Sequence, residues 1–200
     1  MMQKNGFTLL ELMIVMVIVG VLMTALLMSG AGIFGQSAEK ETLVRLQTMA
    51  ALLEQHRTIE GDYPDDRLPK GLPGNTFNVQ AEALFLALFD VGYGGEKPNQ
   101  DWLVNTDGDE TSKSRTELPS PQLFEIADAW GNPVAYYESL HYKTTGQWMA
   151  GLDEEYEEQV SGARRNETTG GWEEPGRFQL ISAGPDGYFD TEDDITHFGN

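Results

Sequence analysis

The pattern of apolar and polar positions begins with an almost unbroken apolar run from Phe7 to about Phe34. Folded as a helix, this run of about 28 residues would be ~42 Å long, because each residue adds 1.5 Å. A bilayer core of about 30 Å needs only ~20 residues. The pattern therefore predicts a transmembrane helix over 7–35, too long for the apolar region of a secretory signal. Lys4 precedes the run and no basic residue follows it directly, which favours a cytoplasmic N-terminus.

Beyond the apolar run, the helical pattern continues with a different spacing. Over 38–59 one stripe holds Leu43, Leu46, either Met49 or Ala50, and Leu53, and charged residues cover much of the remaining surface. This spacing is typical of a helix that packs one face on a globular domain. Glycines between 30 and 35 allow two interpretations, a bend or local melting of the helix, or close packing of neighbouring helices through small residues.

The remainder of the chain, 36–200, predicts a globular head. Gly61-Asp-Tyr63-Pro64 ends the long helix, because proline disfavours helical backbone in the residue before it. Its regular elements are expected at three places, a short helix over 80–89 and strands over 134–142 and 177–183. Polar stretches at 92–121 and 152–175 are expected to be loop insertions. The prediction is an α+β fold, with the long N-terminal helix packed on a small antiparallel β-sheet.

Glu11 is a carboxylate only five positions into the apolar run. A carboxylate at the centre of a bilayer costs roughly 2.5–3.5 kcal/mol on insertion scales, so a specific partner is expected for one. Near the start of a helix the cost is lower, because the interface and the helix dipole both favour the charge. Taken alone, Glu11 is either a tolerated interfacial charge or a residue with a dedicated partner.

The segment Lys4-x-Gly6-Phe7-Thr8-Leu9-Leu10-Glu11 closely resembles the prepilin signature of type IV pilins and type II secretion pseudopilins. The resemblance implies that a membrane prepilin peptidase removes residues 1–6 after Gly6, that Phe7 is then N-methylated, and that Glu11 acts in assembly. Cleavage would create an α-amine, which is largely cationic at neutral pH. The Phe7 amine of a neighbouring subunit could pair with Glu11 and set the register between subunits, since an unpaired buried charge is costly.

Charge is concentrated in the head. The chain has 13 Lys and Arg against 32 Asp and Glu, a net charge of −19 and a pI near 4.3. Such acidity argues against binding to nucleic acid or to anionic membrane surfaces, both of which need a basic patch, and it is compatible with a divalent cation. The chain contains no cysteine, so disulfides cannot brace the head.

A second group of candidate site residues lies near the C-terminus. Five carboxylates fall there within a stretch of nine residues: Asp186, Asp190, Glu192, Asp193 and Asp194. Ca²⁺ takes 6–8 oxygen ligands, commonly carboxylates mixed with backbone carbonyls. Gly184 and Gly187 would let the chain turn tightly enough to aim carbonyls inward. The spacing does not fit the EF-hand pattern. From acidity alone, a solvated acidic loop and a calcium site both remain open.

This stretch also resembles the calcium loop of major pseudopilins, and the segment 128–133, Asp-Ala-Trp-Gly-Asn-Pro, resembles their D-x-W-G-x-P element. By that resemblance, the expected calcium ligands are Asp186, Asp193, Asp194 and Asp190, with backbone carbonyls near Ile181 and Tyr188. The chain departs from the family at Asp190-Thr191, where those proteins tend to have glycines, so the resemblance does not fix which carboxylates bind.

Other candidate sites are weaker. Asn105–Glu110 could hold a second cation, but a polar turn is the favoured interpretation. The histidines at 56, 141 and 197 are far apart and form no catalytic motif. A hydrolase with paired carboxylates needs two acids fixed across a cleft, whereas these acids cluster in one segment. We therefore expect no enzymatic activity.

Together these features predict a structural subunit of a type II secretion pseudopilus, a homo-oligomeric helical fibre. Its expected partners are other pseudopilins, the prepilin peptidase and the inner-membrane assembly platform, with no nucleic acid. The N-terminal helix would anchor the protein in the inner membrane, and the head would lie in the periplasm, stabilised by Ca²⁺. One alternative is a type IV pilin or minor pilin for adhesion, motility or DNA uptake; another is a membrane-anchored calcium-binding domain. The absence of a cysteine pair favours a pseudopilin, and the insertions leave open a major or a minor subunit.

Overall fold

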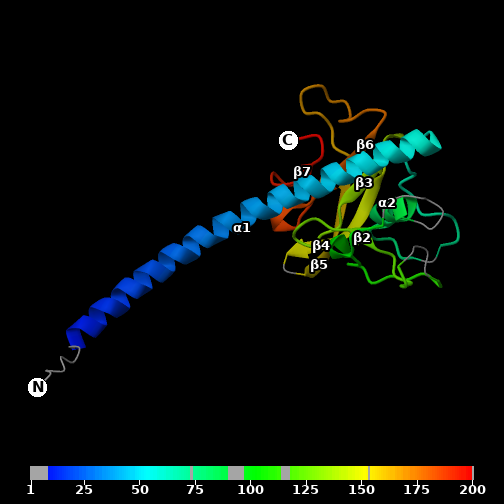
Figure 1. Ribbon diagram of the computed structural model, residues 1–200. Coiled ribbons are helices and arrows are strands. Elements are labelled where there is room, and N and C mark those ends of the chain that lie inside the picture. The colour runs from blue at the N-terminus through cyan, green and yellow to red at the C-terminus, as the bar shows by residue number, and fades with distance from the viewer. Residues whose placement is uncertain (1–8, 73, 90–96, 114–117, 153, 200) are drawn as a thin grey trace, which may run out of the picture. The chain divides into compact units, whose positions relative to one another are not determined.

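The computed structural model describes residues 9–199 except 73, 90–96, 114–117 and 153, and it describes no side chains at 11 and 25–35 (Figure 1). Gly6 and Phe7, the predicted cleavage and methylation sites, lie outside the described residues. So do the side chain of Glu11 and parts of the two predicted insertions. The chain divides into two compact units, Met1–Ser37 and Ala38–Asn200.

Helix α1 (Leu9–Glu60) contributes residues to both units and is 52 residues long. In the first unit its large apolar side chains are exposed, from Leu9 at 79% to Val19 at 47%. Among the described residues, no helix combines the length and the apolar character needed to cross a membrane.

The second unit holds all the remaining elements. Helix α2 (Val79–Phe89) confirms the short helix expected at 80–89. The strands are β1 (Leu103–Val104), β2 (Glu125–Ile126), β3 (Ala135–Glu138), β4 (Thr145–Leu152), β5 (Glu155–Gly162), β6 (Phe178–Ser182) and β7 (Ile195–Thr196). They pair antiparallel as β1–β2, as β3–β6–β7 and as the hairpin β4–β5 (Figure 1). The expected α+β class with small antiparallel sheets is confirmed, and short 3₁₀ turns lie at Gln100–Trp102, Ser139–His141 and Gly184–Asp186.

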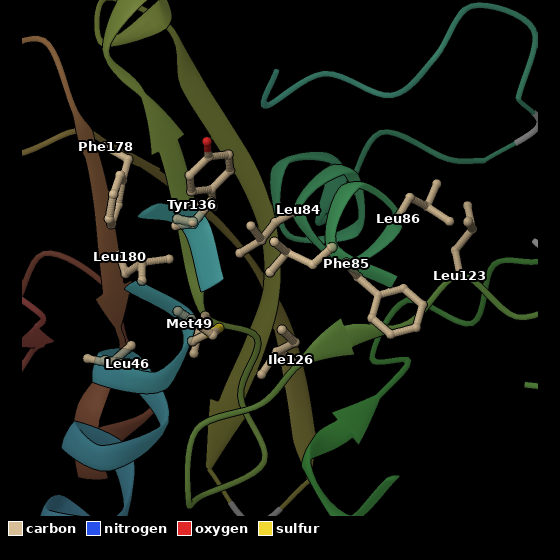
Figure 2. Close-up of a cluster of buried hydrophobic side chains, with 13 residues drawn as sticks. Leu46, Met49, Leu84, Phe85, Leu86, Leu123, Ile126, Tyr136, Phe178 and Leu180 are labelled. Atoms are coloured by element: carbon tan, nitrogen blue, oxygen red, sulfur yellow. The ribbon is translucent and has the colours of Figure 1, made fainter. Parts of the chain in front are cut away.

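The main core joins both helices to the sheets. Leu46, Met49 and Leu53 of α1 are at most 1% exposed, as the stripe predicts, whereas Leu43 is 37% exposed and lies outside it. Figure 2 shows side chains of α1 and α2 gathered with Ile126, Tyr136 and residues of β6. Burial of each such side chain is worth about 1.5–3 kcal/mol. This core fixes the C-terminal part of α1 and helix α2 on the sheets.

The insertion predicted at 152–175 needs a correction, because it contains β5. Strand β5 pairs along its whole length with β4, and Gly151 of β4 lies opposite Tyr156. A side chain at Gly151 would approach the Glu155 carbonyl oxygen to 2.0 Å, so the pairing requires glycine there. Most β5 side chains are exposed and many are acidic, which gives the segment the composition of a surface loop although its backbone is a strand.

The expected strand at 134–142 is shorter than predicted, and β6 is more buried. Strand β3 ends at Glu138, and the chain continues into the turn Ser139–His141. All five residues of β6 are buried rather than alternating, since β6 is the central strand between β3 and β7. These elements place the C-terminal acidic segment between β6 and β7.

Candidate functional site

The segment that follows the processing motif presents an apolar helix surface on all sides. Between Leu9 and Met23, the large apolar side chains described are 47–79% exposed. A helix that is hydrophobic all round requires an apolar environment, either lipid or neighbouring protein. Within this first unit, the side chains that the structure describes do not supply that environment.

The C-terminal loop turns tightly, as its glycines predict. Gly184 and Gly187 have φ values of +69° and +73°, in the left-handed region that favours glycine. A side chain at Gly184 would lie 2.2 Å from the carbonyl oxygen of Asp193, and one at Gly187 would lie 2.5 Å from Gly151. Close backbone approach therefore requires both glycines.

Within this loop, the aspartates mostly accept hydrogen bonds from the loop itself. The Tyr188 N–H donates to Asp186 Oδ1 over 2.8 Å, and the Asp186 N–H donates to Asp193 Oδ2 over 3.2 Å. The other oxygen of Asp193 accepts the Thr191 hydroxyl. These carboxylates hold the turn in shape by capping its own donors.

The remaining two aspartates face β5 and the segment after it. The Ser161 hydroxyl donates to Asp190 Oδ1 over 3.3 Å. Asp194 is 1% exposed, and its Oδ2 accepts the Asp190 N–H over 2.9 Å and pairs with the Arg164 guanidinium. Burial raises the pKa of Asp194 to about 6, although the Arg164 charge opposes that shift. The positive charge beside Asp194 thus comes from the protein.

The predicted calcium ligands do not converge on one point in this arrangement. Ile181 lies within β6 between β3 and β7, and Tyr188 is 42% exposed. No three acids of the loop, all of which are described, have ligand atoms within 4.8 Å of one another. Asp194 Oδ1 is buried without a hydrogen-bond partner, but Arg164 already neutralises that carboxylate. A calcium ion bound at Asp194 would have to displace Arg164.

The D-x-W-G-x-P element has a clear structural role. Asp128 Oδ1 accepts the N–H groups of Trp130 and Asn132 over 2.9 and 3.0 Å, and Oδ2 accepts the Ser182 hydroxyl over 2.7 Å. The Arg45 guanidinium of α1 donates to the carbonyls of Ala127 and Asp128, each over 2.8 Å. This buried turn fastens the helix to β6.

Two further groups of potential ligands lie elsewhere in the head; the first was not expected, and the second includes Asp107 of the segment Asn105–Glu110, for which a polar turn was the favoured interpretation. In the first, His141 Nδ1 lies 2.6 Å from Asp66 Oδ1, with Asp65 beside them. In the second, Glu82 and Glu125 meet Asp107 with ligand atoms within 4.8 Å of one another. One signal was present in the sequence, since Glu82 is the sole charged residue of the apolar segment Val79–Phe89.

Comparison with known proteins bears on the N-terminal segment. Residues 1–27 match the family described as the prokaryotic N-terminal methylation motif. The chain matches no curated protein and no solved structure. The match includes Gly6, Phe7 and Glu11 and covers none of the head. It supports a type IV pilin-like prepilin signature, and hence a type IV pilin-like protein.

Proposed function

We propose that this protein is a structural subunit of a type II secretion pseudopilus, assembled into a helical fibre through its N-terminal helix. One observation carries the proposal. The methylation motif over 1–27 coincides with the start of an apolar helix whose described side chains, from Leu9 to Met23, are exposed all round. A fibre in which these helices pack together would bury that surface.

Processing would prepare the helix for assembly. A prepilin peptidase would remove residues 1–6, and the Phe7 amine would be methylated but still cationic. In the fibre this amine would pair with Glu11 of a neighbouring subunit. Inside an apolar bundle, a wrong register would leave both charges unpaired, at a cost of several kcal/mol. The pair would therefore select one axial offset between subunits.

The proposal also includes a place in the cell. Before assembly, the apolar segment would anchor the subunit in the inner membrane, with the head in the periplasm. Other pseudopilins and the inner-membrane assembly platform would be its partners. The acidic head, with a net charge of −19 for the whole chain, favours solubility over contact with nucleic acid. The subunit would have a mechanical role in protein export and no catalytic one.

Calcium at the C-terminal loop belongs to this proposal as a prediction. Asp194 would be a ligand, because one of its oxygens is buried and has no partner. The competing cation is Arg164, which pairs with the same carboxylate. The alternative is a type IV pilin or minor pilin. In this head an ion pair between Arg164 and Asp194, rather than a disulfide, connects the C-terminal loop to the segment after β5.

The test is incorporation into fibres. Glu11→Val should leave cleavage and membrane insertion intact, because the helix becomes more apolar, yet it should abolish recovery of the subunit in sheared fibres. Leu10→Val, a change of apolar side chain at the adjacent position, is the matched control and should assemble. If the Glu11→Val protein enters fibres as well as the wild type, the proposed register contact is wrong.

A further inference from the structure

Four carboxylates from three separate segments meet inside the head, and we call them the inner carboxylate cluster: Glu82, Asp107, Asp109 and Glu125. Glu82 comes from α2 and Glu125 from β2, while Asp107 and Asp109 belong to the turn after β1. Oxygens of Glu82, Asp107 and Glu125 lie within 4.8 Å of one another. Asp109 contributes to the same electrostatic environment, since its charge raises the pKa values of both Glu82 and Asp107.

Glu82 is the most unusual member of the cluster. It is 0% exposed, and neither of its carboxylate oxygens accepts a hydrogen bond from a donor that the structure describes. One oxygen of Asp107 and one of Asp109 are also buried without a partner. Leaving a buried acceptor unsatisfied is costly, and leaving a buried charge uncompensated is more costly still. Four open carboxylate oxygens in one place therefore require a positively charged or proton-donating occupant.

The other oxygens of the cluster are held in place by the surrounding chain. Glu125 Oε1 accepts the Asn78 side-chain amide over 2.9 Å, and its Oε2 accepts the Thr106 N–H over 3.3 Å. The Asn75 N–H donates to Asp109 Oδ2 over 3.2 Å. Asn105 braces the turn from within, since its side chain donates to the Asp109 carbonyl and accepts the Gly108 N–H. The carboxylates are thus positioned before any ligand arrives.

Among the residues that the structure describes, no Lys or Arg forms an ion pair with these four carboxylates. The ion pairs described among residues 9–199 involve other carboxylates, such as Glu41, Asp65, Glu54 and Asp194. Without a cation, burial and the neighbouring carboxylates raise the pKa of Glu82 to about 10, and burial raises that of Asp107 to about 6. Glu82 would then keep its proton at neutral pH.

We propose that the inner carboxylate cluster binds one divalent cation, and that this cation is Ca²⁺. All the open ligand atoms are carboxylate oxygens, which suit hard cations and not the transition metals that prefer histidine or cysteine. Ca²⁺ accepts 6–8 oxygens at 2.3–2.6 Å in flexible geometry, so ligands on opposite sides of the ion lie up to about 5 Å apart. The ligand atoms of Glu82, Asp107 and Glu125 lie within 4.8 Å of one another, inside that limit. Bound there, the ion would tie α2, the turn after β1 and β2 together.

The test uses full-length protein in detergent, freed of metal with chelator and titrated with CaCl₂. Wild type should bind Ca²⁺, and its melting temperature should rise by roughly 5–11 °C at a hundredfold excess over the dissociation constant. Glu82→Gln should weaken binding at least about tenfold, because it removes a charged ligand. In chelator, however, Glu82→Gln should melt no lower than wild type, because glutamine resembles the protonated acid that the metal-free site holds.

Matched controls separate this site from the C-terminal loop. Asp107→Asn should act like Glu82→Gln, whereas Asp193→Asn in the loop and Glu158→Gln on exposed β5 should retain the part of the Ca²⁺-dependent shift that Glu82→Gln removes. Mg²⁺ should substitute poorly, since it demands near-ideal octahedral geometry at 2.0–2.1 Å. If Glu82→Gln keeps the full shift while Asp193→Asn loses it, calcium binds at the loop and the inner cluster is not the site. A wild-type protein that shows neither heat of binding nor a shift would also overturn the proposal.

Discussion

The guanidinium of Arg164 pairs with the buried carboxylate of Asp194 and so connects the segment after β5 to the acidic C-terminal loop. The same guanidinium lies 3.4 Å from the Thr191 carbonyl oxygen, to which it also donates. Asp194 is almost fully buried, while the Arg164 side chain is 28% exposed. The Arg164 guanidinium therefore neutralises Asp194, a role that a cation bound at the loop could take over.

Replacing this arginine tests whether the loop can exchange one cation for another. Arg164→Gln should destabilise the chelated protein by about 1–3 kcal/mol, because a buried acceptor loses its charged donor. If the loop binds calcium, Ca²⁺ should restore most of that loss by taking the place of the guanidinium. The measurement is thermal unfolding with and without Ca²⁺. Arg165→Gln removes the same charge from the neighbouring position, where the side chain stacks on Trp172, and should show no such rescue.

An equal loss of stability in chelator and in Ca²⁺ for Arg164→Gln would show that Asp194 serves only the ion pair. The prediction that the loop binds calcium would then be wrong. Calcium binding at the inner carboxylate cluster is tested separately by the Glu82 and Asp107 variants.

The turn around Asp128 should be among the most sensitive positions of the head. Asp128→Ala leaves the Trp130 and Asn132 N–H groups and the Ser182 hydroxyl without their acceptor. We expect a loss of at least about 2 kcal/mol in the free energy of unfolding. Denaturant titration of the full-length protein measures it, with the exposed Glu158→Ala as control. A loss below about 0.5 kcal/mol, the usual range for surface substitutions, would mean that water replaces the carboxylate.

Much of the helical and core structure follows from local sequence. The spacing of Leu46, Met49 and Leu53 repeats with the helical period, and these residues are buried where the period predicts. Helix α2 and strand β6 are likewise visible as compact apolar runs. The N-terminal signature needs no fold at all, since the peptidase and the neighbouring helices would recognise a linear segment.

Other features depend on contacts that local sequence does not reveal. Strand β5 is rich in Glu155, Glu157 and Glu158, so its composition indicates a loop, and only its pairing with β4 makes it a strand. The inner carboxylate cluster joins Glu82 to residues 25 to 43 positions later in the chain. Such convergence is set by tertiary packing. Two local signals were present: Glu82 is an acid in an otherwise apolar helix, and Asp107 and Asp109 lie in the polar segment Asn105–Glu110.

Processing makes a prediction that is independent of the head. Mass spectrometry of the protein from its native membrane should find Phe7 as the N-terminal residue, carrying an N-methyl group. Gly6→Ala should still be cleaved if a small residue suffices, whereas Gly6→Trp should block cleavage because of its bulk. Intact Met1 in cells that possess a prepilin peptidase would contradict the assignment of residues 1–6 as a leader.

His197 makes the stability of the head depend on pH. Its ring stacks on Phe178 with 4.8 Å between centroids, and its Nδ1 accepts the Leu180 N–H over 3.2 Å. Burial lowers the pKa of His197 in the folded protein, against the opposing charges of Glu174 and Glu54. Below the unfolded value of about 6.5, the unfolded chain therefore binds the proton first. Stability is then lost as pH falls and is fully present above that value.

The measurement is the free energy of unfolding of wild type and His197→Asn from pH 8 to pH 5, because asparagine keeps an acceptor for the Leu180 N–H without a titrating ring. Both proteins share every other ionisable group, so the difference between their profiles isolates His197. Wild type should lose more stability than His197→Asn as pH falls below about 6.5. Parallel profiles for wild type and His197→Asn would mean that the ring is protonated equally in both states, and that its stacking on Phe178 tolerates the charge.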